Sequence, residues 1–198
     1  IQPEPAQTIL RWQFNSTLEP IDIYVTINGA LTALQALTML KSLLYFQGRF
    51  KSKLSACSLE LHRPSDVVCN KRMKPPVTNP LRLHWLTSLD ARRWFEDILN
   101  LWQPADLEFH LYEFETYLKY IGTIPVNHYA GISALGKLIV PYVIPTSIDK
   151  IICVDADTLW NHDVADLWKQ FDHFKPKQVS QQCKYKRLDL KSGTNDNY

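Results

Sequence analysis

Two carboxylates in one short stretch, Asp155 and Asp157, are the residues of this chain best suited to do chemistry. They follow an apolar run at residues 151–154, whose composition predicts a buried strand that ends in an acidic loop. Ligands of open α/β sheets bind just outside the carboxyl ends of the strands. Side chains two residues apart in an extended segment share a face, so both acids could converge on one hard cation and an anionic ligand. A bare Asp-x-Asp also occurs in solvated loops, but its position after an apolar strand favours a metal or phosphate site.

Hydrophobic periodicity predicts an α/β fold that positions this acidic pair. Strands are expected where apolar and polar residues alternate, at residues 21–27, 81–86 and 107–112. Helices are expected where apolar residues recur at helical spacing, at residues 33–47, 90–102, 125–138 and 164–174. A strand, a turn and an amphipathic helix open many nucleotide-binding α/β domains, and also many unrelated folds.

Several polar residues of these elements have simple structural interpretations. His84 and His110 lie on the sides of their strands that face away from the apolar positions, so both are expected to be exposed to solvent. Lys137 is the only formal charge on its predicted helix, where a lysine usually covers apolar surface with its stem. Asp163 is a plausible N-cap of the last helix.

Composition bounds the class of protein. The chain has 198 residues, of which 45% are hydrophobic, and this predicts one globular domain. Its formal net charge of +2 is too small to indicate a nucleic-acid surface. The four cysteines lack the spacing of zinc ligands, and Cys153, between two apolar neighbours, is expected to be a small buried residue. Whether Cys57 and Cys69 pair depends on a redox compartment that the sequence does not state.

Three segments lack sustained periodicity. Residues 1–20 are expected to be a leader or stem, 51–80 a long loop or insertion, and 178–198 a polar tail. No signal peptide and no apolar run of transmembrane length is present. Because the chain begins with Ile1, we treat it as a fragment.

Residues 125–174 resemble glycosyltransferase family 8, in particular the LARGE-type xylosyl- and glucuronyltransferases. The resemblance rests on HYAGI at 128–132, GKL at 136–138, DKIICVDADT at 149–158 and DVADLW at 163–168. Weaker similarity covers residues 23–46 and 81–112. The resemblance implies a GT-A fold, a Rossmann-like mixed sheet flanked by helices, in a partial domain at residues 21–177. It also implies retaining transfer of a sugar, with xylose favoured, from a UDP-sugar donor to a glycan acceptor on a glycoprotein.

The resemblance also assigns roles to residues by position. Asp155 and Asp157 become ligands of Mn²⁺, or of Mg²⁺, whose preference for hard oxygen ligands suits carboxylates. The cation stabilises the negative charge that grows on UDP as the bond to the sugar breaks. The residues that would contact the donor are Thr26, Ile27, Asn28, Lys137, Asp155 and Ala156. No catalytic nucleophile or base is identified.

The chain departs from the family pattern in three places. Ala30 and Leu31 stand where the family commonly has an aromatic residue that stacks on uracil. Residues 51–80 are inserted where the family has a short link. After Val179 the resemblance stops, so the family's acceptor site and its downstream histidine ligand have no counterpart, and we expect a truncated product. The resemblance implies a Golgi type II membrane protein whose anchor would precede Ile1, and no nucleic-acid partner.

Two other functions compete with this interpretation. Haloacid-dehalogenase-like phosphohydrolases also have an apolar strand that runs into Asp-x-Asp-x-Thr-Leu, and in that case Asp155 would be the nucleophile. Those enzymes carry the motif near the start of the domain and need lysine and acidic motifs after it, whereas little chain follows Asp157 here. The chain could also be a catalytically inactive fragment that binds a nucleotide sugar, because half a sheet with an exposed edge is a poor catalyst.

Overall fold

A mixed five-stranded sheet organises the computed structural model, which describes residues 7–12, 16–49, 57–58, 68–69, 79–102, 104, 106–127, 131–175 and 178. The strands of this sheet are β1 (Gln7–Trp12), β2 (Ile21–Ile27), β5 (Leu81–Thr87), β6 (Leu107–Glu113) and β7 (Ile152–Val154). Their order across the sheet is β1-β6-β5-β2-β7, with β1 antiparallel to β6 and the other pairs parallel. Two short strands, β3 (Cys57–Ser58) and β4 (Val68–Cys69), pair separately.

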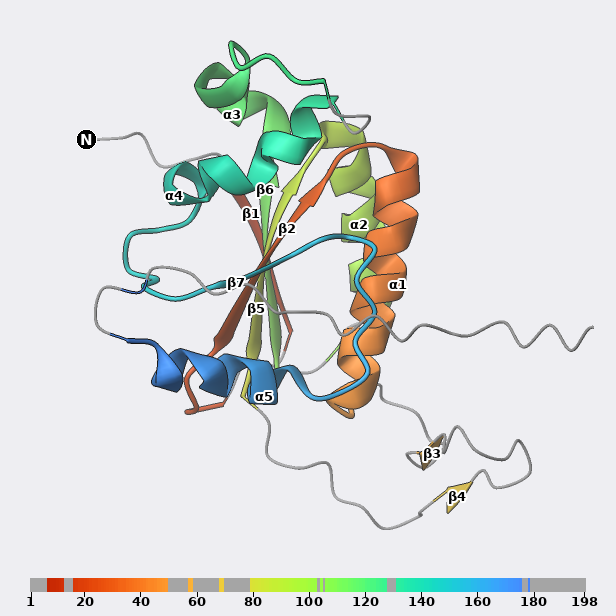
Figure 1. The fold of residues 1–198 in the computed structure, drawn as a ribbon. Coiled ribbons are helices and arrows are strands. Elements are labelled where there is room, and N and C mark those ends of the chain that lie inside the picture. The colour runs from red at the N-terminus through yellow and green to blue at the C-terminus, as the bar shows by residue number, and fades with distance from the viewer. Residues whose placement is uncertain are drawn as a thin grey trace, which may run out of the picture.

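Helices flank the sheet (Figure 1). They are α1 (Ala30–Phe46), α2 (Leu89–Trp102), α3 (Phe114–Ile121), α4 (Val140–Val143) and α5 (Val164–Trp168), with 3₁₀ helices η1 (Gly131–Ile139) and η2 (Lys169–His173). The apolar side of β2, β5 and β6 packs against α1 and α2 in one core cluster that includes Val25, Trp85 and Phe109. A second cluster joins the opposite side of the sheet to α3, η1 and α4. The mixed α/β architecture predicted from the sequence is confirmed.

Three local predictions were wrong. The apolar strand before Asp155 was expected to be buried, yet β7 is an edge strand among the described strands, and Cys153 is exposed. Residues 128–130 of the single helix expected at 125–138 lie outside the described part of the chain, and from Gly131 on the structure has the 3₁₀ helix η1 in its place. Helix α4 follows η1 and has Pro141 in its first turn, where the missing N–H costs no hydrogen bond. Within the stretch expected to be a leader, β1 pairs with β6.

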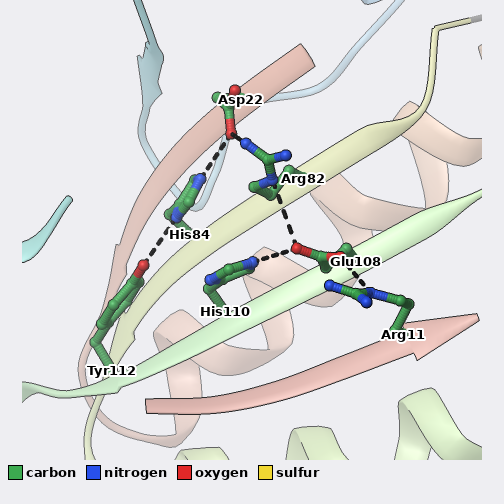
Figure 2. Close-up of polar contacts among 7 residues, drawn as sticks. All are labelled: Arg11, Asp22, Arg82, His84, Glu108, His110 and Tyr112. Carbon is green, nitrogen blue, oxygen red and sulfur yellow. Dashed lines mark hydrogen bonds and ion pairs between the residues drawn. The ribbon is translucent and has the colours of Figure 1, made fainter. Parts of the chain in front are cut away.

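A buried polar layer covers part of the sheet face that carries the second cluster (Figure 2). His84 is 0% exposed and His110 is 8% exposed, so the expectation that both histidines face solvent was wrong. Each contacts a carboxylate: His84 Nε2 lies 2.8 Å from Asp22 Oδ1, and His110 Nε2 lies 2.5 Å from Glu108 Oε1. Ion pairs with arginines on neighbouring strands complete the layer, so each buried carboxylate has a cationic partner.

The geometry also fixes the protonation of the buried histidine. Burial lowers the pKa of His84, which keeps its imidazole neutral. The Nε2–H group therefore donates to Asp22, and the hydroxyl of Tyr112 donates to Nδ1 over 3.0 Å. Burial alone would raise the pKa of Glu108, but hydrogen bonds from His110 and Arg11 outweigh it and hold that pKa at about 2.

Stability is expected to fall in two steps on acidification. His84 has a lower pKa when folded than its ordinary 6.5, so its contribution is present above that pH and is lost as protons bind the unfolded chain below it. Glu108 has an ordinary pKa of 4.5 and a folded pKa of about 2, so its contribution is lost between these values. Urea unfolding between pH 8 and pH 2 checks this. Glu108→Gln should flatten the lower step, whereas Glu115→Gln, on the exposed side of α3, should not. A midpoint that rises on acidification contradicts the assignment.

Candidate functional site

The carboxyl ends of β2 and β7 bring the first set of candidate residues together. These two strands are parallel and pair Ile23 with Ile152, Tyr24 with Cys153 and Val25 with Val154. In this register β7 ends at Val154, so Asp155 leaves the sheet beside Thr26, which is still part of β2. The pairing of β2 with β7 therefore places the acidic loop next to the carboxyl end of β2, where ligands of α/β sheets bind.

Lys137 and Asp155 form an ion pair at this edge. Lys137 Nζ lies 2.7 Å from Asp155 Oδ1, and the two side chains are 48% and 69% exposed. Both were candidates from the sequence, and the structure joins them although they come from different elements. An exposed ion pair of this kind contributes little to stability. Because both side chains are exposed, the Lys137 ammonium is accessible to an anion and the Asp155 carboxylate is accessible to a metal ion.

Asp157 lies in the turn that follows β7. The backbone N–H of Thr158 donates to the carbonyl of Asp155 over 3.1 Å, which closes this turn, and Asp157 is exposed on it. No group of three or more potential metal ligands is found among the described residues. Two exposed carboxylates fit a hard divalent cation that takes its other ligands from water and phosphate oxygens, because Mg²⁺-type sites commonly use one or two protein carboxylates.

The remaining candidates differ in what they expose. Ile27 is 0% exposed and its carbonyl accepts from the backbone N–H of Ser88, so it presents no accessible group to a ligand. Ala156 is 5% exposed and presents very little. Asn28 is exposed directly after β2. The hydroxyl of Thr26 donates to the hydroxyl oxygen of Tyr24 over 3.3 Å, so this side chain is partly engaged within the protein.

The loop after the acidic pair is fastened to α1, a feature that periodicity did not predict. The backbone N–H of Trp160 donates to Ser42 Oγ over 3.0 Å, and Gln47 Nε2 donates to Asp163 Oδ1 over 2.8 Å. Asp163 also accepts from the backbone N–H of Ala165 over 2.9 Å, which confirms it as the N-cap of α5. Figure 1 shows this segment running along α1 towards α5. Helix α1 and its C-cap residue Gln47 thus hold the loop at Trp160 and Asp163, downstream of the two aspartates.

Ser42→Ala is expected to loosen this loop. The substitution removes the oxygen that accepts from the backbone N–H of Trp160, so hydrogen exchange at that amide should speed up about threefold to tenfold. Thr38→Ala is the matched control, since Thr38 donates to a carbonyl of the same helix but does not reach the loop. Equal exchange at Trp160 in all three proteins would show that Ser42 does not anchor the loop.

Two other polar groupings are less suited to act on a ligand. The His84, Asp22 and Tyr112 arrangement resembles a catalytic relay, but His84 is fully buried and reaches no substrate. A pocket of about 240 Å³ lies near the amino end of β2. Its charged lining includes Lys150, paired with Glu19 over 2.9 Å, and Arg82, paired with Asp22 over 3.2 Å. These charges are already compensated.

Comparison with known proteins identifies relatives over half of the chain. No protein-family model matches. The chain is 36% identical over 101 residues to the xylosyl- and glucuronyltransferase LARGE2 of Mus musculus, a match that covers 51% of this chain and 15% of the relative. It is 33% identical over 101 residues to LARGE1 of Danio rerio, covering 51% of this chain and 13% of the relative. It is 32% identical over 98 residues to the glycosyltransferase-like protein LARGE of Caenorhabditis elegans, covering 50% and 16%.

A solved structure supports the fold. The crystal structure of mouse xyloside xylosyltransferase 1 in its apo form superposes with a TM-score of 0.52 at 15% identity, covering 80% of this chain and 50% of that one. The shared fold is the GT-A-like α/β arrangement predicted from the motifs. None of the helices in the described part of the chain is long and apolar enough to span a membrane.

Proposed function

We propose that this chain, which is similar over about half its length to LARGE-type glycosyltransferases, is part of such a catalytic domain and forms the donor-binding half of a glycosyl-transfer site. The observation that carries this proposal is the ion pair between Lys137 and Asp155 at the carboxyl ends of β2 and β7. A diphosphate needs positive charge. At this edge of the sheet Lys137 can supply such a charge, and the carboxylate pair can hold a cation that adds to it. The donor is a UDP-sugar, and Thr26, Asn28 and Ala156 contribute to its binding at the end of β2 and in the acidic turn, whereas Ile27 is fully buried and supports the end of β2 from within.

Asp155 and Asp157 are the residues that would hold the divalent cation. Their exposed carboxylates are hard oxygen ligands, which favours Mn²⁺ or Mg²⁺ over softer metals. When bound, the cation supplies Lewis-acid stabilisation of the charge on the departing UDP. The protein's part is to present both carboxylates on one turn, and Ser42 and Gln47 hold the loop that follows this turn at Trp160 and Asp163.

Lys137 has two alternative partners in this scheme. Without ligand its ammonium neutralises Asp155, at 2.7 Å. If a cation were held by Asp155, the Lys137 ammonium would be free to bind a phosphate oxygen, which is a strong charge-assisted contact. The lysine therefore supports nucleotide binding and competes with the metal for Asp155.

The names of the relatives guide the finer assignments. Two of them are xylosyl- and glucuronyltransferases and the structural neighbour is a xylosyltransferase, which supports xylose as the transferred sugar. We further propose a retaining reaction with a glycan on a glycoprotein as acceptor, carried out in the Golgi lumen by a type II membrane protein. The domain at residues 21–177, with an insertion at 51–80 and a tail at 178–198, belongs to the same proposal.

A thermal-shift experiment separates this function from its rivals. UDP with Mn²⁺ should raise the melting temperature of the full chain, and either ligand alone should do much less. Hydrolysis of p-nitrophenyl phosphate that is lost in Asp155→Asn would instead support a phosphohydrolase. UDP that stabilises the chain equally without any divalent cation would overturn the metal-dependent donor site.

A further inference from the structure

A buried tyrosine joins the end of β2 to the helix that carries Lys137. Tyr24 is 0% exposed, and its hydroxyl donates to the backbone carbonyl of Gly136 over 2.9 Å. The same hydroxyl oxygen accepts from Thr26 Oγ1 over 3.3 Å. Burial raises the pKa of Tyr24 far above its ordinary value, so the phenol stays protonated and remains a donor. This bond joins two residues that are 112 positions apart in the sequence, and one of them, Gly136, directly precedes Lys137.

Gly136 is pressed against the same strand end. A Cβ at this position would lie 2.9 Å or less from three side-chain atoms of Thr26: Oγ1, Cγ2 and Cβ. Any side chain other than hydrogen would push η1 away from β2. The close approach explains why a glycine precedes Lys137, and it fixes the height of this backbone above the sheet.

We propose that Tyr24 and Thr26 are positioning residues that align Lys137 with Asp155 and, through it, with the donor diphosphate. The proposal rests on the function assigned above and deepens it. Exposed lysines have many rotamers, and an exposed ion pair is too weak to select one. The position of Lys137 must therefore be set by its backbone, which the Tyr24 hydroxyl and the Thr26 side chain hold at Gly136. Neither residue needs to touch the reacting atoms.

Tyr24→Phe tests this role with the loss of one oxygen. We expect the affinity for UDP in the presence of Mn²⁺ to fall about threefold to tenfold in calorimetry, the size of one lost hydrogen bond. Tyr112→Phe is the matched control, because Tyr112 is equally buried on the same sheet face but bonds His84 instead of η1. That variant should bind UDP within about twofold of the wild type. An equal loss in both variants would mean a general destabilisation and would overturn the proposal.

A double-substitution cycle asks whether the effect passes through Lys137. In a Lys137→Ala background, adding Tyr24→Phe should change UDP affinity by less than about twofold, because residues that act as a unit are non-additive. Full additivity would overturn the positioning role. If Tyr24→Phe does not fold, Thr26→Val is tested instead by the ammonium signal of Lys137 without nucleotide, because Thr26 is also proposed to contact the donor. The signal should shift, since the variant removes the hydroxyl that donates to Tyr24, and an unchanged signal would overturn the positioning role.

A readout without nucleotide separates this proposal from the proposed function. The ammonium signal of Lys137 in a proton–nitrogen correlation spectrum should shift in Asp155→Asn and shift similarly in Tyr24→Phe, but not in Tyr112→Phe. If the wild type does not bind UDP, the proposed function fails while this signal still tests the placement of Lys137. A Lys137 signal that is unchanged in Tyr24→Phe would overturn the inference even if UDP binds.

Discussion

Asp157→Asn is expected to abolish Mn²⁺-assisted binding of UDP. The substitution keeps the size of the side chain and replaces an anionic ligand with a neutral amide on an exposed turn. Altering groups that merely support a metal ligand commonly costs about 10- to 100-fold in metal affinity, so loss of a ligand should cost about 100-fold or more. Calorimetric titration of UDP into the full chain with saturating Mn²⁺ measures the effect.

The control for this experiment is Asp97→Asn. Asp97 is exposed on α2, so its substitution makes the same change in charge without touching the acidic turn. Its UDP affinity should match the wild type. An Asp157→Asn chain that binds UDP as tightly as Asp97→Asn, with both folded, would remove Asp157 from the metal site.

Lys137→Ala is expected to change two affinities in opposite directions. The variant frees Asp155 from its ion pair, so Mn²⁺ alone should bind about twofold to fivefold more tightly, the range of an exposed pair. With Mn²⁺ present, UDP should bind about tenfold more weakly, because a charge-assisted contact with phosphate is lost. The second effect should shrink in high salt, since an exposed charge is screened.

Lys169→Ala provides the comparison. Lys169 is also exposed, and its Nζ lies 3.1 Å from Asp166 Oδ1. Lys169→Ala therefore removes an equivalent ion pair away from the site. Electron paramagnetic resonance of free Mn²⁺ and calorimetry of UDP together measure both affinities. If both fall in Lys137→Ala, the lysine does not compete with the metal. If neither changes, the ion pair has no part in binding.

The sequence predicts the parts of this structure that depend on local pattern and on order along the chain. Alternation was sufficient for β2, β5 and β6, because each has one face on an apolar core. The N-cap role of Asp163 was also local. The neighbourhood of Lys137 and Asp155 followed from motifs in a recognisable order, without any knowledge of their distance.

What the sequence did not predict depends on contacts between distant segments. The polar faces of β5 and β6 were expected to be exposed because alternation cannot show which residues cover a face. Asp22 on the neighbouring strand β2 pairs with His84, and Arg11 and Arg82 on neighbouring strands pair with Glu108, which also contacts His110 on its own strand. The bond from Tyr24 to Gly136 has no local signal. The edge position of β7 is a property of strand order, which a single strand's composition does not encode.

The central claim is that a divalent cation binds at the carboxyl ends of β2 and β7, and paramagnetic broadening by Mn²⁺ tests it most directly. In amide spectra of the full chain, Mn²⁺ with UDP should broaden the signals of Asn28, Lys137 and Asp157 first. The signals of Asp22 and Asp149, which line the pocket near the amino end of β2, should remain sharp. Broadening that begins at Asp22 and Asp149 while Asp157 stays sharp would contradict the site.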